Sequence, residues 1–150
     1  MPQSLASLHI HLVFSTKQRI AWLDDDIRSD LHRYITGVLR ELKSPVVAIN
    51  SVEDHIHVLF HLSRTSCIAS IVEEVKTTSS KWIKTKGDRF QNFRWQVGYG
   101  AFAVSKSRVS SVMKYIARQR EHHPKETFDR EFVELLRAHE IPFDERYFLE

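Results

Sequence analysis

The sequence contains little cysteine, proline or glycine, and it has no long apolar run. Its single cysteine, Cys67, cannot form a disulfide within the chain, and it lacks the partner thiols of a zinc site. We expect it to be a packing residue at a helix start. No apolar stretch approaches the roughly 20 residues that a membrane helix needs. The first residues carry no basic stretch followed by an apolar one, so we expect no export signal and a cytoplasmic protein.

Linkers, internal repeats and nucleotide-binding signatures are also missing. Without a Pro-, Gly- or Ser-rich linker, a chain of 150 residues is expected to form one domain, residues 1–150. The patterns G-x-x-x-x-G-K-[ST] and G-x-G-x-x-G do not occur, so any chemistry proceeds without ATP. Apolar residues make up 42% of the chain and aromatic residues 11%, which suffices for a packed core.

Basic charge is concentrated in one segment. The formal net charge is +3, but residues 76–120 carry eleven basic residues against one acid, Asp88, and are therefore +10, which leaves −7 elsewhere. Such asymmetry indicates a face that binds a polyanion, although lysine-rich solvated helices would give the same pattern. Aromatic residues interleave with these charges and can stack on unpaired bases, although we expect most of them in the core. They are Trp82, Phe90, Phe93, Trp95, Tyr99 and Phe102.

Apolar periodicity predicts an α+β fold. Alternating residues predict strands over 8–15, 46–52 and 56–62, and a strand pair over 93–97 and 101–105 that brackets Gly98-Tyr99-Gly100. Helical spacing predicts helices over 24–42 and 68–83, from Ser107 to near His122-His123-Pro124, and over 127–139, with Ser66 and Ser107 as possible caps. This order is typical of the split βαβ, ferredoxin-like or RRM-like arrangement, an antiparallel sheet backed by helices, with extra C-terminal helices.

Two histidines, His55 and His57, lie two positions apart on a predicted strand. Alternate residues of a strand share a face, so the imidazoles project together about 6.6 Å apart along the strand axis. That spacing suits one divalent ion, and added carboxamide or carboxylate oxygens would suit Mg or Mn. Packing is the alternative, because His9 and His11 have the same spacing. Asp54 could orient one of the histidines, but a turn position is favoured.

Tyr115 lies at the border between an apolar stripe and a polar face of a predicted helix. Gln119 is four residues further on and therefore its neighbour on that face. At about 100° per residue, four polar residues fall within about 60° of Tyr115, namely Arg108, Ser111, Arg118 and His122. A chemical role fits this position, and so does a packing tyrosine with its hydroxyl in water.

Three stretches taken together resemble a known family. Residues 53–59, which contain His55-Ile56-His57, residues 95–105 and residues 115–119 with the following Glu121-His122-His123 are similar to the single-tyrosine HUH transposases. These are the enzymes of the smallest bacterial insertion sequences, of the IS-two-hundred type, to which the REP-associated tyrosine transposases are related. Residues 11–17 also resemble the family's opening strand, so the resemblance covers essentially the whole chain.

The resemblance implies a site and a reaction. His55 and His57 would bind a divalent metal, Mg or Mn, with Gln119 as third ligand and Tyr115 as nucleophile. The enzyme would cut and rejoin single-stranded DNA at hairpin ends of an insertion sequence through a 5′-phosphotyrosine. A homodimer is implied, in which the tyrosine helix of one subunit can complete the metal site of the other. No family role attaches to His9 or His11.

DNA contacts are expected from the basic segment. The candidates are Arg94, Lys106, Arg108, Lys114 and Arg118. A tyrosine hydroxyl has an ordinary pKa of about 10 and needs a nearby cation to become a nucleophile, and Arg118 is a candidate for that role as well.

Other functions remain compatible with the sequence. An HUH relaxase or replication initiator is one, although those enzymes usually carry further domains. A non-catalytic nucleic-acid-binding module is another, because the same fold serves that purpose. A domesticated transposase that serves its host is a third.

Overall fold

A four-stranded antiparallel sheet forms the centre of the molecule. The computed structural model describes residues 3–122 and 127–144. The elements of its first part follow in the order β1 (His9–Ser15), α1 (Asp25–Glu41), β2 (Val46–Ser51), β3 (His55–His61), α2 (Ile68–Lys84) and β4 (Gly100–Val104). The strand order across the sheet is β2-β3-β1-β4, and every neighbouring pair is antiparallel. The predicted α+β fold of the split βαβ type is therefore confirmed.

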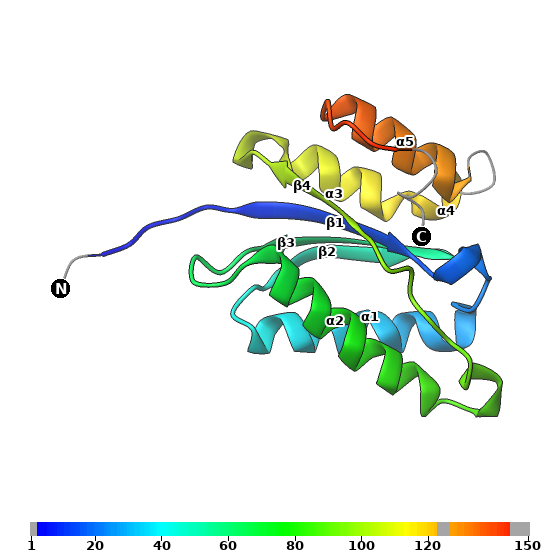
Figure 1. Cartoon of the computed structure of the whole chain (residues 1–150). Helices are drawn as coiled ribbons and strands as arrows, with labels where there is room; N and C mark the ends of the chain where they lie inside the picture. Colours follow the sequence, from blue (N-terminus) through cyan, green and yellow to red (C-terminus); the bar gives the residue numbers. More distant parts are fainter. Residues whose placement is uncertain (1–2, 123–126, 145–150) are drawn as a thin grey trace.

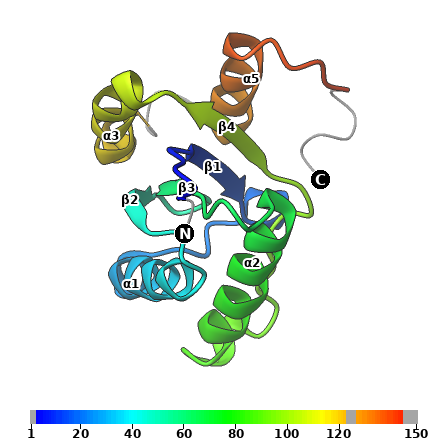
Figure 2. The same ribbon diagram turned by 90° about the vertical axis from the view of Figure 1, so that its left-hand side faces the viewer.

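Helices cover both faces of the sheet. Figures 1 and 2 show α1 and α2 on one face and α3 (Val109–Ala117) and α5 (Phe128–Ala138) on the other. The short helix α4 (Gln119–His122) follows α3 in the chain. The expected C-terminal helices are thus present, and they close the face of the sheet that α1 and α2 leave uncovered.

The two faces are built from alternate residues of the same strands. On β3, Ile56, Val58 and Phe60 point into the larger core beneath α1 and α2, and each is fully buried. Burying one such side chain stabilises the fold by about 1.5–3 kcal/mol. His55, His57 and Leu59 therefore point to the opposite face, under α3 and α5.

Helix starts are only partly predicted by the sequence. The carboxylate of Asp24 caps α1 by accepting a hydrogen bond from the Asp26 amide at 3.0 Å, and the hydroxyl of Thr127 caps α5. The predicted caps by Ser66 and Ser107 are wrong. The residue before α2 is Cys67, which is exposed instead of packed, and Ser107 lies in a 3-10 turn, Lys106–Arg108, ahead of α3.

The predicted strand over 93–97 does not form. Only Trp95 makes a bridge, to Thr16, and no hairpin turns at residues 98–100. The segment instead lies across the end of β1, where the Gln96 amide donates to Ser15 O at 2.9 Å and the Gln96 side chain accepts from the Ser15 amide at 2.8 Å. The ammonium of Lys76 donates to the carbonyls of residues 96–98 at 2.6–3.2 Å. These partners replace those of a hairpin.

The tyrosine helix is shorter than predicted. It ends at Ala117, and Arg118 leaves helical geometry with φ −97° and ψ 17° before α4 begins at Gln119. The end of α3 is held to the sheet because the side-chain Nδ2 of Asn50 donates a hydrogen bond to Ile116 O at 2.9 Å. The predicted helix end at His123-Pro124 lies outside the described residues.

Gly100 allows α5 to approach the sheet. It pairs with Val13 in the sheet, and a Cβ atom there would lie 2.4 Å from Cε2 of Phe132. Phe128, Phe132 and Leu136 of α5 form a second small core with Val13 and Phe102. Within the described part of the chain, no helix is long and apolar enough to span a bilayer.

Candidate metal centre and tyrosine

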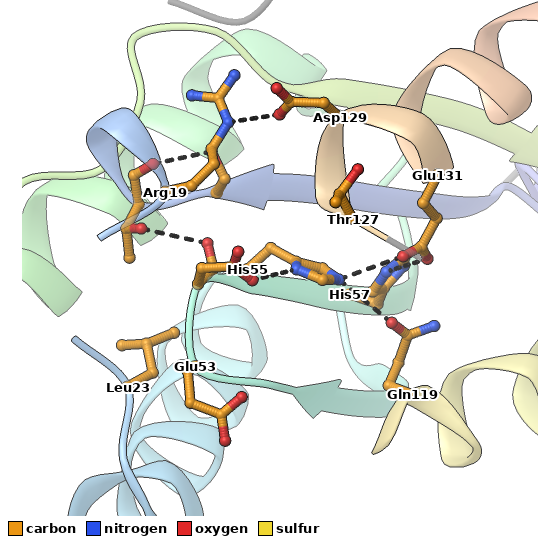
Figure 3. Close-up of polar contacts among 12 residues, drawn as sticks. Arg19, Leu23, Glu53, His55, His57, Gln119, Thr127, Asp129 and Glu131 are labelled. Atoms are coloured by element: carbon orange, nitrogen blue, oxygen red, sulfur yellow. Dashed lines mark hydrogen bonds and ion pairs between the residues drawn. The ribbon is translucent and has the colours of Figure 1, made fainter. Parts of the chain in front are cut away.

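Five polar side chains meet on the face of the sheet that α3 and α5 cover. His55 and His57 come from β3, Tyr115 from α3, Gln119 from α4 and Glu131 from α5. Figure 3 shows Gln119 and Glu131 approaching the two histidines from different helices. The residues singled out from the sequence as ligands and nucleophile therefore come together, and one residue that the sequence analysis did not single out, Glu131, joins them.

Glu131 contacts both histidines. Its Oε1 lies 2.9 Å from Nε2 of His57, and its Oε2 lies 3.4 Å from Nε2 of His55. Oε1 of Gln119 lies 3.3 Å from the same His55 nitrogen. His55, His57 and Glu131 are all buried, and each offers one donor atom within 4.8 Å of the other two. Two imidazole nitrogens and two side-chain oxygens thus converge on one point.

The far nitrogen of each imidazole has a partner that fixes the ring. Nδ1 of His55 lies 2.7 Å from Oδ1 of Asp54, and Nδ1 of His57 lies 2.8 Å from Nε2 of His11. When both rings are neutral and each Nδ1 donates its proton, the two Nε2 lone pairs face Glu131 and Gln119, which is the tautomer that a metal requires. A metal would therefore displace the second proton that His55 carries without it. Asp54 therefore contacts a histidine besides occupying a turn, contrary to the preferred expectation, and His11, for which no role was expected, contacts His57.

The charges in the cluster depend on one another. Burial disfavours a charged His55, but its hydrogen bonds to Asp54 and Glu131 outweigh burial and raise its pKa to about 9. Burial also disfavours an ionised Glu131, but hydrogen bonds to His55 and His57 hold the pKa of this carboxyl well below its usual range. Burial and the neighbouring His57 lower the pKa of His11 to about 3, so His11 stays neutral. A negative carboxylate beside two imidazoles is a site for positive charge.

The Tyr115 hydroxyl donates a hydrogen bond to Oε1 of Glu131. Its ring stands edge-on to His57, with the two centroids 5.7 Å apart. Tyr115 therefore belongs to the cluster and is not a border tyrosine with its hydroxyl only in water. All five residues come from one chain, so the tyrosine helix approaches the histidines of its own subunit.

Local sequence patterns do not place Glu131 in the site, because its position depends on how α5 packs against the sheet. The helix is held by the small core around Phe132 and by Asp129, which accepts from Nε of Arg19 at 2.8 Å. One signal was available in the sequence. Glu131 stands on the apolar stripe of α5, one residue before Phe132, where a solvated carboxylate is not expected.

The candidate DNA contacts do not form one patch. Lys106, Arg108, Lys114 and Arg118 are exposed on the segment that contains α3. Arg94 instead lines a separate cavity beside Lys76 of α2, of about 420 Å³. Arg120 is paired with Asp25 at 2.6 Å, and Arg89 with Asp24. The basic segment 76–120 is thus divided between the two sides of the sheet.

Comparisons with known proteins identify the family of the chain and agree with its fold. The sequence profile of the family described as "Transposase IS200 like" matches residues 4–119. Among solved structures, a candidate transposase from Deinococcus radiodurans R1 superposes with a TM-score of 0.62 at 21% identity, over 79% of this chain and 98% of that one. A REP-associated tyrosine transposase bound to a REP hairpin gives a TM-score of 0.62 at 17% identity, over 82% and 72%. No curated protein matches the chain. Since the profile spans most of the sequence, the chain belongs to the IS200-like transposase family.

Proposed function

We propose that this transposase cuts and rejoins single-stranded DNA through a covalent link to Tyr115. One observation carries the proposal: the Tyr115 hydroxyl donates to the same buried carboxylate that contacts Nε2 of both His55 and His57. A nucleophile, an oriented histidine pair and a negative charge in one place are the parts that metal-assisted phosphoryl transfer requires.

The donor set fits a divalent metal. His55 and His57 would hold it with their Nε2 atoms, and Gln119 and Glu131 with side-chain oxygens, a mixture that suits Mg or Mn. The fit rests on the convergence of these donors and on the partners, Asp54 and His11, that fix both imidazoles. When bound, such an ion would neutralise charge on the phosphate oxygens and on the leaving oxygen.

The residues of the chain supply the rest of the reaction. The Tyr115 oxygen attacks phosphorus, the bond from phosphorus to the 3′-oxygen breaks, and the proton lost by tyrosine is balanced by the one that the 3′-hydroxyl gains. The ester bond is exchanged and not hydrolysed, so a 3′-hydroxyl can later reverse the step without ATP. Glu131 orients the hydroxyl in the ground state, and its lowered pKa makes it a poor base, so its role at Tyr115 is positioning.

The proposed substrate is a single-stranded DNA hairpin at the end of an insertion sequence. The solved relative at 17% identity is bound to a REP hairpin, which supports this class of partner. Exposed cations on the α3 segment, such as Lys114 and Arg118, are suited to phosphate contacts.

The first experiment is a gel assay on 5′- and 3′-labelled single strands from the DNA that flanks the gene. Wild type is expected to give a denaturant-stable adduct that retains the label 3′ of the cut, in Mn²⁺ or Mg²⁺ but not in chelator. The Tyr115→Phe variant should give none. Tight binding without any adduct in wild type would favour a non-catalytic nucleic-acid-binding module instead.

A second experiment tests the donor set without relying on activity. Titration of Mn²⁺ followed by electron paramagnetic resonance should show affinity reduced about 10- to 100-fold in Glu131→Gln. The matched control is Glu134→Gln, which removes the same charge from the exposed side of α5 and should bind Mn²⁺ as wild type does. Equal affinity in Glu131→Gln and wild type would remove Glu131 from the ligand set.

A homodimer is also proposed, and its active site can be tested for mixing between subunits. Because Tyr115 lies beside its own His57, a dimer of this conformation would hold two complete sites. Subunits with Tyr115→Phe mixed with subunits with His57→Ala should then stay inactive. Restored activity would show that the tyrosine helix exchanges between subunits, and sedimentation that finds only monomers would contradict the dimer.

A further inference from the structure

A groove opens between α3 and α5 at Tyr115. Its volume is about 790 Å³, within the range of about 300–1,000 Å³ that small-molecule sites occupy. His11 and Phe102 of the sheet line it, with Arg108 and Tyr115 on the α3 side and Leu135 on the α5 side. Figure 2 shows α3 and α5 apart from each other, on opposite sides of β4.

Tyr115 stands between this groove and the metal centre. Gln119, four residues after Tyr115, contacts His55, whereas Ser111 and Arg108, four and seven residues before it, line the groove. The tyrosine helix therefore runs from the groove to the metal centre, with the hydroxyl of Tyr115 at the junction.

We propose that this groove holds the nucleobase immediately 3′ of the cut, an inference that rests on the proposed function. Attack by Tyr115 leaves the phosphate, and with it the 3′-side nucleotide, joined to the tyrosine oxygen. The 5′-side nucleotide departs in line, away from that oxygen. The nucleotide that stays attached is joined to Tyr115 through its own phosphate, so its base must lie within one nucleotide's length of the tyrosine oxygen. The groove is the space that opens at that position.

The lining has the chemistry of a site for an unpaired nucleotide. None of the twelve described residues that line the groove is acidic, and Arg108 adds a positive charge at its edge. One face of the exposed His139 ring stacks on Phe102, with centroids 4.5 Å apart. His139 is itself one of the residues that line the groove, and histidine is among the side chains on which unpaired bases stack.

Filling the groove tests the proposal without cleavage. In the Tyr115→Phe background, Ser111→Trp from one wall and Ala138→Trp from the other should each weaken binding of a fluorescent twelve-nucleotide oligodeoxythymidylate about tenfold, the size of a lost base stack. Ser110→Trp is the matched control, because Ser110 is also exposed on α3 but does not line the groove. Binding unchanged in both filled variants would overturn the proposal.

The position of the base is tested on the strand whose cut has been mapped. An abasic residue immediately 3′ of the cut should weaken binding to Tyr115→Phe about tenfold but have little further effect once Ser111→Trp fills the groove. Equal effects in both proteins, or the same coupling for an abasic residue 5′ of the cut, would contradict the assignment. If filling the groove weakens DNA binding but wild type forms no adduct, the groove would still be a DNA-binding site, and the proposed reaction of Tyr115 would be rejected.

Discussion

The two faces of the sheet are equally buried but chemically different. On β3, Ile56 and Val58 face α1 and α2, while His55 and His57 face α3 and α5, and all four side chains have 0% exposure. Burial therefore does not distinguish the face that stabilises the fold from the face that carries the site. The difference lies in the partners: Ile56 and Val58 pack into the larger apolar core, whereas the histidines meet a carboxylate, an amide and a hydroxyl from three helices.

Two neighbouring residues on opposite faces of β3 should differ strongly in what they contribute to stability. Phe60→Ala should lower the free energy of unfolding by about 3–5 kcal/mol, because it empties a fully buried position under α1 and α2. His61→Ala should cost only about 1 kcal/mol, the loss of one hydrogen bond from the Leu8 amide. Urea unfolding measures both, and equal losses would mean that the two faces contribute alike to stability.

The proposed metal site tests the second face alone. Mn²⁺ at one hundred times its dissociation constant should stabilise wild type by about 2.7 kcal/mol relative to chelator. For a chain of 150 residues this corresponds to about 5–10 °C in Tm. His57→Ala should lose the shift, while His32→Gln, on α1, should keep it. An unchanged shift in His57→Ala would place the ion elsewhere.

Two glycines give opposite expectations. Gly100→Ala should cost about 1–3 kcal/mol and weaken Mn²⁺ binding, because its Cβ atom would push against Phe132, the neighbour of Glu131 on α5. Gly37→Ala, in α1 with no atom within 4 Å of the new Cβ, should stabilise the protein by about 0.5–1 kcal/mol. Thermal unfolding and Mn²⁺ titration measure both, and unchanged Mn²⁺ affinity in Gly100→Ala would uncouple α5 from the metal centre.

The smallest effect concerns a histidine outside the site. Burial and the nearby Arg28 lower the pKa of His32 from 6.5 to about 4. Between pH 6.5 and 4, His32 is protonated in the unfolded chain but neutral in the folded protein. The free energy of unfolding that depends on His32 is therefore at its full value above pH 6.5 and declines as pH falls below it. The loss should be about 1–2 kcal/mol after allowance for partial exposure. His32→Gln should flatten this part of the curve of unfolding free energy against pH, and an unaltered slope would contradict the assignment.

The fold was predictable because its signals are local. The alternation of Ile56, Val58 and Phe60 and the apolar spacing of α1 depend only on neighbours in sequence, and both are confirmed. The segment 93–97 has equally good strand residues, but its hydrogen bonds go to Ser15 and Lys76, a choice made by tertiary contacts. A strand pattern does not reveal which partner is available.

The candidate site was predictable where its residues lie close together in the sequence. His55 and His57 share a strand, and Tyr115 and Gln119 lie four residues apart, although a break at Arg118 separates their helices. The contact of His11 with His57 depends on the β1–β3 register, in which Val13 and not His11 stands opposite His57. Glu131 reaches the site only because Gly100 lets α5 pack closely.

The position of Glu131 in the chain also sets a time at which the site becomes complete. Its carboxylate is synthesised 74 residues after His57, the difference between positions 131 and 57, and after every strand of the sheet. At about 5–20 residues per second, the ribosome needs about 4–15 s to cover that stretch. During this interval the growing chain has both histidines and Asp54, but not the carboxylate that faces the two Nε2 atoms. The transposase thus gains the Glu131 carboxylate only after all four strands of the sheet have been synthesised.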